Sequence, residues 1–257
     1  MKTGRRTPGL SKKRLLCGAC VLLLLLLCSC SEKRSFEWET PEQALEKAAE
    51  AMLDCCFDAE YGEHYGRLIR WEEPVRIAVR GEYTNEDLIV IGQMINEICS
   101  RVLTLPPIRF ALEGEAANAV ISFVPMREMS TATDGYREGN EGFVSWNWEN
   151  YTIRQMKVAI ATDCTDRATR SHLIREEFLQ GLGVQDDLDS YSDSIFYRPF
   201  TETQELSPVD HLILYCLYHP ELRAGMDKNE ARQALKELCA LPLPEPLLEL
   251  LGEKTEL

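Results

Sequence analysis

The residues with the clearest chemical potential lie in the stretch RSHLIREEFLQGLG, at positions 170–183. On a helix, His172, Glu176 and Gln180 stand at i, i+4 and i+8 and share one face, with Glu177 about 100° further around it. Histidine and carboxylate side chains on consecutive turns can bind a metal ion, and a neighbouring carboxylate can act as a general base. The stretch therefore contains the parts of a metal-dependent hydrolase.

The same side chains also have a structural interpretation, in which each one has an ordinary protein partner. Gln180 would donate to the backbone of the turn at Phe196, and His172 would be a surface or capping residue. The two adjacent glutamates would be solvated or paired with one of three arginines: Arg170, Arg175 and Arg198.

The spacing of this stretch resembles the zinc-protease motif HExxHxxG, with both histidines replaced. Under that resemblance Glu176 and Gln180 occupy the two metal-ligand positions, and Glu177 occupies the position of the general base. Gly183 matches the glycine at which metzincins turn the chain, and Asp186 falls at the third ligand position. The stretch therefore keeps the spacing of the motif but lacks its histidines.

A second motif follows in SIFYRPFTETQELSPVDHLILYCLYHP, residues 194–220. It resembles the Met-turn segment of metzincins of the matrixin type, with Phe196 at the position of the methionine and Tyr197 after it. Asp210 is interpreted as the carboxylate that begins a helix. Two motifs in the right order at plausible spacing are more specific than either motif alone.

Together with the amino-terminal pattern described below, these motifs resemble a bacterial lipoprotein family catalogued only as a domain of unknown function. The resemblance covers roughly Trp71 to Ala231. It implies an α+β, degenerate metzincin-like (zincin) domain with no established activity, and it implies no substrate.

The residue types at the ligand positions argue against a catalytic zinc ion. A catalytic zinc normally has three protein ligands, rich in histidine, and a bound water. Glu176 and Asp186 are acceptable oxygen ligands, but Gln180 offers only a neutral amide carbonyl. We therefore expect no metal cofactor and a non-catalytic binding or scaffold domain. The alternative is an active metallopeptidase-like hydrolase with a non-standard zinc site, in which Glu177 is the base and His172 is an additional ligand.

The elements that would position these residues can be predicted from hydrophobic periodicity and capping signals. The pattern predicts a small mixed sheet with two backing helices and a mainly helical C-terminal subdomain. The glycine-rich stretch 130–142, beside Trp146, Trp148 and Tyr151, is the natural place for contact with a partner. Helices are predicted at 40–59, 84–102, 169–183, from 207 and at 227–239, and strands at 75–81, 108–112, 119–124, 142–148 and 155–162.

The amino terminus predicts export. Residues 1–13 are basic, and an apolar run follows from Leu15 to Leu27, which is too short for a comfortable membrane span. The run ends in LCSC, which resembles a lipobox and would make Cys30 the lipidated first residue of the mature chain. We predict a signal peptide at 1–29, a tether at 30–39 and a single domain at 40–257, lipid-anchored to a membrane of the bacterial cell envelope.

Composition restricts the partners. Six of the 28 basic residues and none of the 42 acidic residues lie before Cys30, so the mature chain would carry 22 basic residues against 42 acidic ones. Such an acidic body repels phosphate groups, and we predict no nucleic-acid partner and a possible envelope protein or peptide instead. Six cysteines remain after the lipobox, and they would form up to three disulfides or stay as buried thiols: Cys55, Cys56, Cys99, Cys164, Cys216 and Cys239.

Overall fold

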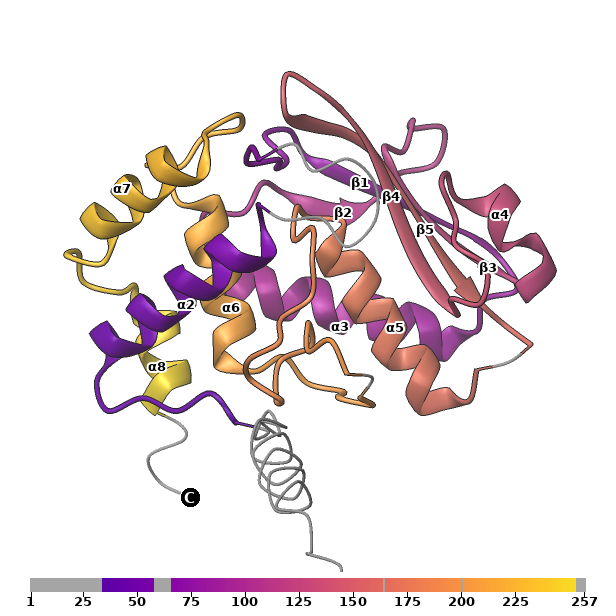
Figure 1. Cartoon of the computed structure of the whole chain (residues 1–257). Coiled ribbons are helices and arrows are strands. Elements are labelled where there is room, and N and C mark those ends of the chain that lie inside the picture. The colour runs from indigo at the N-terminus through magenta and orange to yellow at the C-terminus, as the bar shows by residue number, and fades with distance from the viewer. Residues whose placement is uncertain (1–33, 58–65, 164, 200, 253–257) are drawn as a thin grey trace, which may run out of the picture. The chain divides into compact units, whose positions relative to one another are not determined.

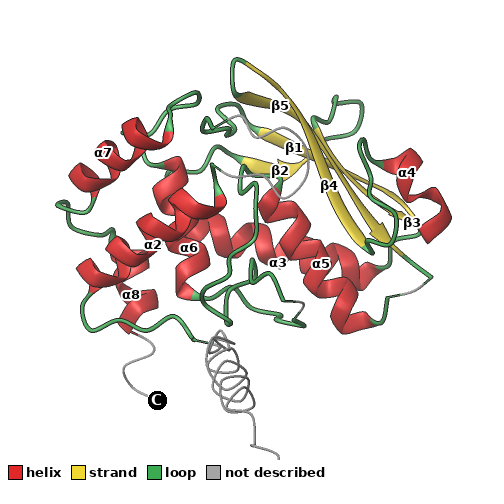
Figure 2. Ribbon diagram, in the orientation of Figure 1, coloured by secondary structure: helices red, strands yellow, loops and turns green. Residues whose placement is uncertain are grey.

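Five strands form one mixed sheet in the computed structural model, which describes residues 34–57, 66–163, 165–199 and 201–252. The predicted signal peptide and Cys30 lie outside the described residues. In the part of the chain that the structure describes, no helix is long and apolar enough to cross a membrane. The predicted α+β class, with a small mixed sheet and packed helices, is confirmed (Figure 2).

The sheet has the strand order β2-β1-β3-β5-β4, and only the pairing of β4 with β5 is antiparallel. A tight turn joins these two strands at Asn150 and Tyr151, which have φ values of 51° and 64°. Two residues with positive φ are typical of a hairpin turn that matches the twist of the strands. The strands are β1 (Val75–Gly81), β2 (Ile108–Phe110), β3 (Ala119–Val124), β4 (Gly142–Glu149) and β5 (Thr152–Ala161).

Two long helices lie on one side of the sheet, α3 (Asn85–Arg101) and α5 (Arg167–Gln180) (Figure 1). A capping box begins α3, because Thr84 accepts from the backbone of Asp87 and the Asp87 carboxylate accepts from the backbone of Thr84. A short helix, α4 (Met129–Ala132), contacts β3 and β5. Its last three residues belong to the glycine-rich stretch 130–142, where no helix was predicted.

The remaining helices form the half of the molecule on the left in Figure 1: α2 (Pro41–Cys55), α6 (Pro208–Tyr218), α7 (Lys228–Leu238) and α8 (Glu245–Gly252). Each predicted helix in this half exists. The prediction that this subdomain is C-terminal needs a correction, because the N-terminal helix α2 packs against α6 and α7. Periodicity identifies the apolar face of α2, where Leu45 and Met52 are buried, but it does not identify the partner of that face.

The end of α5 differs from the prediction. The helix ends at Gln180, and Gly181 caps it with φ −61°, so Gly183 is not the capping residue. Gly183 lies in the following turn with φ 116°, and a Cβ atom there would be 2.3 Å from the carbonyl oxygen of Ile69. The chain before β1 passes close to this turn, and Trp71 donates its indole N–H to the carbonyl of Gly181 at 3.0 Å. Gly183 is therefore required, because a side chain at this position would clash with the backbone of Ile69.

Candidate functional site

His172 is buried on α5 and has two polar partners. Its Nδ1 lies 2.9 Å from the carbonyl oxygen of Thr203, and its Nε2 lies 3.3 Å from Oε2 of Glu176. The prediction of a surface or capping histidine was wrong, since the residue is only 2 % exposed. Burial lowers the pKa of His172, but the hydrogen bond to Glu176 and its negative charge outweigh burial and raise the pKa above its ordinary value.

The two contacts fix the protons of this imidazole. A carbonyl oxygen only accepts, so we assign a proton to Nδ1, which faces Thr203. The other ring nitrogen faces the carboxylate of Glu176, and a proton there forms an ion pair. The Nε2 atom of His172 and the Oε2 atom of Glu176 therefore contact each other, and neither of these two atoms is free to bind a metal ion.

Gln180 has a different partner from the predicted one. Its Nε2 donates to Oδ1 of Asp187 at 2.8 Å, and not to the backbone of the turn at Phe196. The helix and the loop that follows it are thus connected across one turn. A side-chain amide that donates to a carboxylate makes a charge-assisted hydrogen bond, which is stronger than a bond between neutral groups.

Asp186, at the predicted third ligand position, is held by Arg198. Its Oδ1 lies 3.1 Å from Nη2 of Arg198 and also accepts from the backbone N–H of Asp187 at 2.9 Å. The same guanidinium donates through Nε to Asp189 at 2.8 Å. Arg198 thus binds two aspartates of the loop that follows α5. The structural interpretation had allowed it to pair with the two glutamates of α5 instead.

Glu177 faces the sheet. The residue is 8 % exposed, and a Cβ atom placed on Gly142 would be 2.7 Å from its Oε1. The carboxylate therefore lies directly against the first residue of β4. The other two predicted partners have contacts of their own: Arg170 binds Asp87 of α3 through two hydrogen bonds of 3.0 and 2.7 Å, and Arg175 donates to the carbonyl and the hydroxyl of Ser171 at 2.9 and 2.6 Å.

The turn at Phe196 is anchored from α6. Phe196 is fully buried, and its carbonyl accepts from Leu188 at 2.7 Å, while Tyr197 pairs with Leu188 as an isolated bridge. Ser194 donates its hydroxyl to Oδ1 of Asp210 at 2.5 Å. The predicted role of Asp210 at the start of a helix is confirmed, but its link to this turn joins residues 16 apart, and no local signal predicts it.

Asp210 is a buried carboxylate with four donors. Besides Ser194, these are the backbone of Ile195 at 3.1 Å and the backbone and hydroxyl of Ser207 at 2.7 and 3.0 Å. Burial raises the pKa of Asp210 to about 6, although the hydrogen bonds from Ser194, Ile195 and Ser207 lower it. The turn that resembles the Met-turn is therefore held by a group whose charge is costly to bury.

These partners bear on metal binding. Within the described residues, no three side chains among histidine, cysteine, aspartate and glutamate are arranged to hold a metal ion. Glu176, Gln180 and Asp186 instead contact three different protein groups. The donor set as it stands does not fit a catalytic zinc ion, which needs three convergent ligands.

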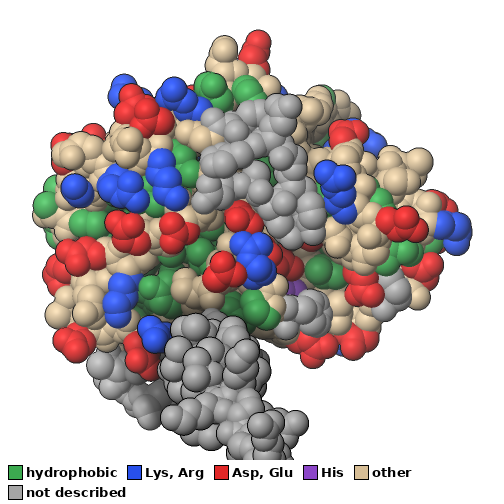
Figure 3. Space-filling model, in the orientation of Figure 1, with side chains coloured by type: hydrophobic (Ala, Val, Ile, Leu, Met, Phe, Trp, Pro, Cys, Tyr) green, Lys and Arg blue, Asp and Glu red, His purple; other side chains and the backbone are tan. Residues whose placement is uncertain are grey.

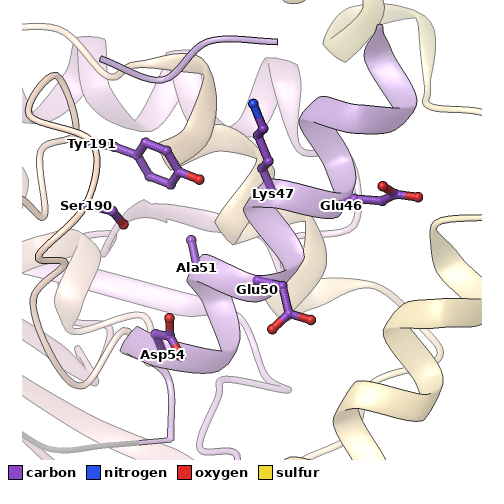
Figure 4. A pocket seen from close by; sticks show the side chains of 7 residues that line it. All are labelled: Glu46, Lys47, Glu50, Ala51, Asp54, Ser190 and Tyr191. Atoms are coloured by element: carbon purple, nitrogen blue, oxygen red, sulfur yellow. The ribbon is translucent and has the colours of Figure 1, made fainter. Parts of the chain in front are cut away.

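A hollow of about 300 Å³ lies between α2 and the loop at Ser190 and Tyr191 (Figure 4). Its three carboxylates come from α2, and two of them have cationic neighbours on α7, namely Lys228, 3.6 Å from Asp54, and Arg232, 3.8 Å from Glu50. Acidic and basic side chains are interspersed on the face shown in Figure 3. The sequence did not predict this hollow, which is lined by Glu46, Lys47, Glu50, Ala51, Asp54, Ser190 and Tyr191.

Two of the aromatic residues beside stretch 130–142 contact each other. Trp148 stacks on Tyr151 with ring centroids 5.0 Å apart and 12° between the planes. Six cysteines were predicted to form disulfides or to stay as buried thiols, and one of them, Cys164, lies outside the described residues. The other five are free thiols, and burial raises the pKa of Cys55 and Cys216 well above the ordinary value.

Comparison with known proteins gives one assignment. The model of the family described as "Protein of unknown function (DUF2927)" matches residues 46–237, which is most of the chain. No curated protein matches the sequence. The chain therefore belongs to the DUF2927 family.

Proposed function

We propose that the protein is a lipoprotein anchored outside the cytoplasm, in the bacterial cell envelope, and that its metzincin-like domain binds an envelope protein or peptide without catalysing a reaction. One observation carries the non-catalytic part. Each position that would hold a zinc ligand is engaged by another protein group: Glu176 by His172, Gln180 by Asp187, and Asp186 by Arg198.

The arrangement of elements supports the metzincin-like assignment. Helix α5, which carries the degenerate motif, packs against β4 and β5, and α3 packs beside it. A glycine with positive φ, Gly183, turns the chain after this helix. The fully buried Phe196 occupies the turn that resembles the Met-turn, and this turn is connected back to the acidic loop through Leu188.

The energetics favour the scaffold over a hydrolase. For a metal ion to bind here, it would have to displace the proton between His172 and Glu176, and Arg198 would have to leave Asp186. The buried contact of His172 with Glu176 contributes roughly 1.5–3 kcal/mol, and the more exposed contact of Arg198 with Asp186 about 1 kcal/mol or less, while Gln180 would return only a neutral carbonyl ligand. An active hydrolase that uses Glu177 and His172 is the second candidate, and in it bonds to a metal ion would have to replace these contacts.

Lipid anchoring rests on the sequence pattern before Ser31. A basic segment, a short apolar run and Cys30 after a small residue are typical of a lipobox. Acyl chains at Cys30 would supply the multiple anchoring signals that stable attachment needs. The acidic mature chain then faces a compartment where its partner is a protein or peptide and not a nucleic acid.

Metal binding by the purified domain tests the non-catalytic part. The wild-type domain should contain no stoichiometric zinc after dialysis against zinc and removal of the excess. The variant Glu176→His/Gln180→His/Asp186→His should bind about one zinc ion per chain if the frame is that of a metzincin. A matched control moves the third histidine to Asp189, outside the frame, and should bind zinc more weakly.

Two results would contradict the proposal in different ways. One zinc ion per wild-type chain, together with peptidase activity that disappears in Glu177→Gln, would establish the hydrolase. Equal zinc affinity in the triple variant and its control would reject the metzincin-like frame. Anchoring is tested separately, because Cys30→Ala in the full chain should abolish incorporation of labelled palmitate and move the protein out of the membrane fraction.

A further inference from the structure

The first described residues are fastened to the body of the domain. The backbone N–H of Ser192 donates to the carbonyl of Arg34 at 2.8 Å, and the backbone N–H of Phe36 donates to Oδ1 of Asp193 at 2.8 Å. The ring of Phe36 is 1 % exposed and meets Tyr191 edge-on, with centroids 5.0 Å apart and 88° between the planes. We call residues 34–38 together with 191–193 the clasp.

Further contacts hold the clasp against α2. Lys47 donates through Nζ to the carbonyl of Glu37 at 2.7 Å, and the ring of Trp38 lies 5.3 Å from that of Phe36. Tyr191 adopts φ 63°, which few residues other than glycine adopt, and in this conformation its ring meets Phe36. The segment that was predicted to be part of a tether, at 30–39, is thus packed from Arg34 onwards.

The clasp leaves little free chain. Only residues 31–33 separate Cys30 from Arg34. Four extended steps of the backbone reach at most about 14 Å. A domain of this length is roughly 40 Å across. A lipid anchor at Cys30 would therefore hold one particular face of the domain close to the membrane, because the body cannot turn over on so short a connection.

We propose that the clasp fixes the orientation of the domain on a lipid surface. The face next to the membrane is then formed by the clasp and the adjoining residues Asp189 and Ser190. The proposal rests on the lipid anchor of the proposed function. Figure 1 shows the start of the described chain at the bottom of the molecule and the β4–β5 hairpin at the top. The hairpin therefore points away from the lipid, where a partner in the envelope can reach it.

The exposed side chains of this face carry charges of both signs, since Glu37 and Asp189 accompany Arg34. Arg34 is exposed next to the anchor and can approach the phosphate groups of the lipids, whereas Phe36 is withdrawn into the clasp. The face is not an apolar patch that inserts into the bilayer. Its attachment comes from the acyl chains, and its orientation comes from the clasp.

Fluorescence quenching by lipids tests the orientation on the full-length, lipidated protein in vesicles of phosphatidylethanolamine and phosphatidylglycerol. A fluorescent amino acid is incorporated either at Ser190, next to the clasp, or at Asn147, near the hairpin; both positions are exposed. Lipids with nitroxide-labelled headgroups quench at short range only. We expect quenching at Ser190 to exceed quenching at Asn147 several-fold.

Release of the clasp should remove this difference. Phe36→Ala deletes the ring that Tyr191 contacts, and Phe110→Ala, at an exposed aromatic residue on β2, is the matched control. An insertion of 20 Gly/Ser residues between Lys33 and Arg34 leaves the clasp intact and lengthens the connection by about 25 Å. Both the Phe36 variant and the insertion should lower quenching at Ser190 toward the Asn147 level, and the control should not.

The outcomes separate this proposal from the lipid anchor itself. Protein that does not float with the vesicles indicates failure of the anchor. Protein that floats but is quenched equally at Ser190 and Asn147 overturns the orientation. Hydrogen exchange supplies a second measurement, because the amides of Phe36 and Ser192 should be protected in the wild type and exchange faster in Phe36→Ala, while the core of the sheet keeps its protection.

Discussion

The buried carboxylate of Asp210 gives a stability prediction with a defined sign. Its pKa is raised from 3.8 to about 6 by burial, so between these values the folded protein holds a proton that the unfolded chain has released. The free energy of unfolding therefore decreases as pH rises through this interval. The change amounts to roughly 3 kcal/mol, since each pKa unit corresponds to about 1.4 kcal/mol.

Comparison with Asp210→Asn isolates this contribution, because other groups titrate in the same range. Asp166 and Glu115, for example, have pKa values lowered by hydrogen bonds and change stability in the opposite direction. Urea unfolding of both proteins at a series of pH values gives the difference in unfolding free energy. We expect this difference to move in favour of the asparagine variant by roughly 3 kcal/mol between pH 3.5 and pH 7.

A change of the opposite sign would refute the reasoning. Asp210 accepts from two hydroxyls and two backbone N–H groups, which favour the charged carboxylate. If these donors outweighed burial, the pKa would fall below 3.8, and the asparagine variant would lose stability relative to the wild type as pH rises. A flat difference would mean that donors and burial cancel.

Three further predictions concern the contacts of α5. Arg170→Ala leaves the carboxylate of Asp87 buried without its bidentate partner, and urea unfolding should show a loss of roughly 3 kcal/mol. Gly183→Ala should cost about 2 kcal/mol or more from positive φ and a backbone clash, whereas Gly252→Ala, with open space around it, should change the melting temperature little. His172→Gln should remove a stabilisation that is present below the ordinary histidine pKa and lost as pH rises through the raised pKa, so the difference in stability between wild type and variant should become smaller at alkaline pH.

Local signals predicted most of the elements and their beginnings. Thr40, Thr84 and Ser207 each precede a helix, with the partner three residues later that caps require, and all three helices begin there. These signals work because both members of each hydrogen bond lie within one turn. The ends of the helices were less predictable. Helix α5 ends at Gln180, and the carbonyl of its cap, Gly181, accepts a hydrogen bond from Trp71, which is far away in the sequence.

Contacts between distant segments account for what the sequence did not predict. The bond from Phe36 to Asp193 joins residues 157 apart, and the bond from His172 to Thr203 joins residues 31 apart. Hydrophobic pattern shows that a residue will be buried, but it does not select the partner. At the candidate site the frame of Glu176, Gln180 and Asp186 was visible in the spacing, whereas the groups that engage them depended on tertiary packing.

The contacts around α5 suggest how a metzincin-like frame, as we propose it, can persist without metal. A metal ion would join the helix to the loop that follows through ligands from both segments. Here Gln180 joins the same two segments by donating to Asp187, and Arg198 closes the loop on Asp186. Both bonds are charge-assisted. The buried turn at Phe196 also contributes to the order of the loop. Neither of these two bonds needs an ion, so the loop should keep its conformation in the presence of a chelator.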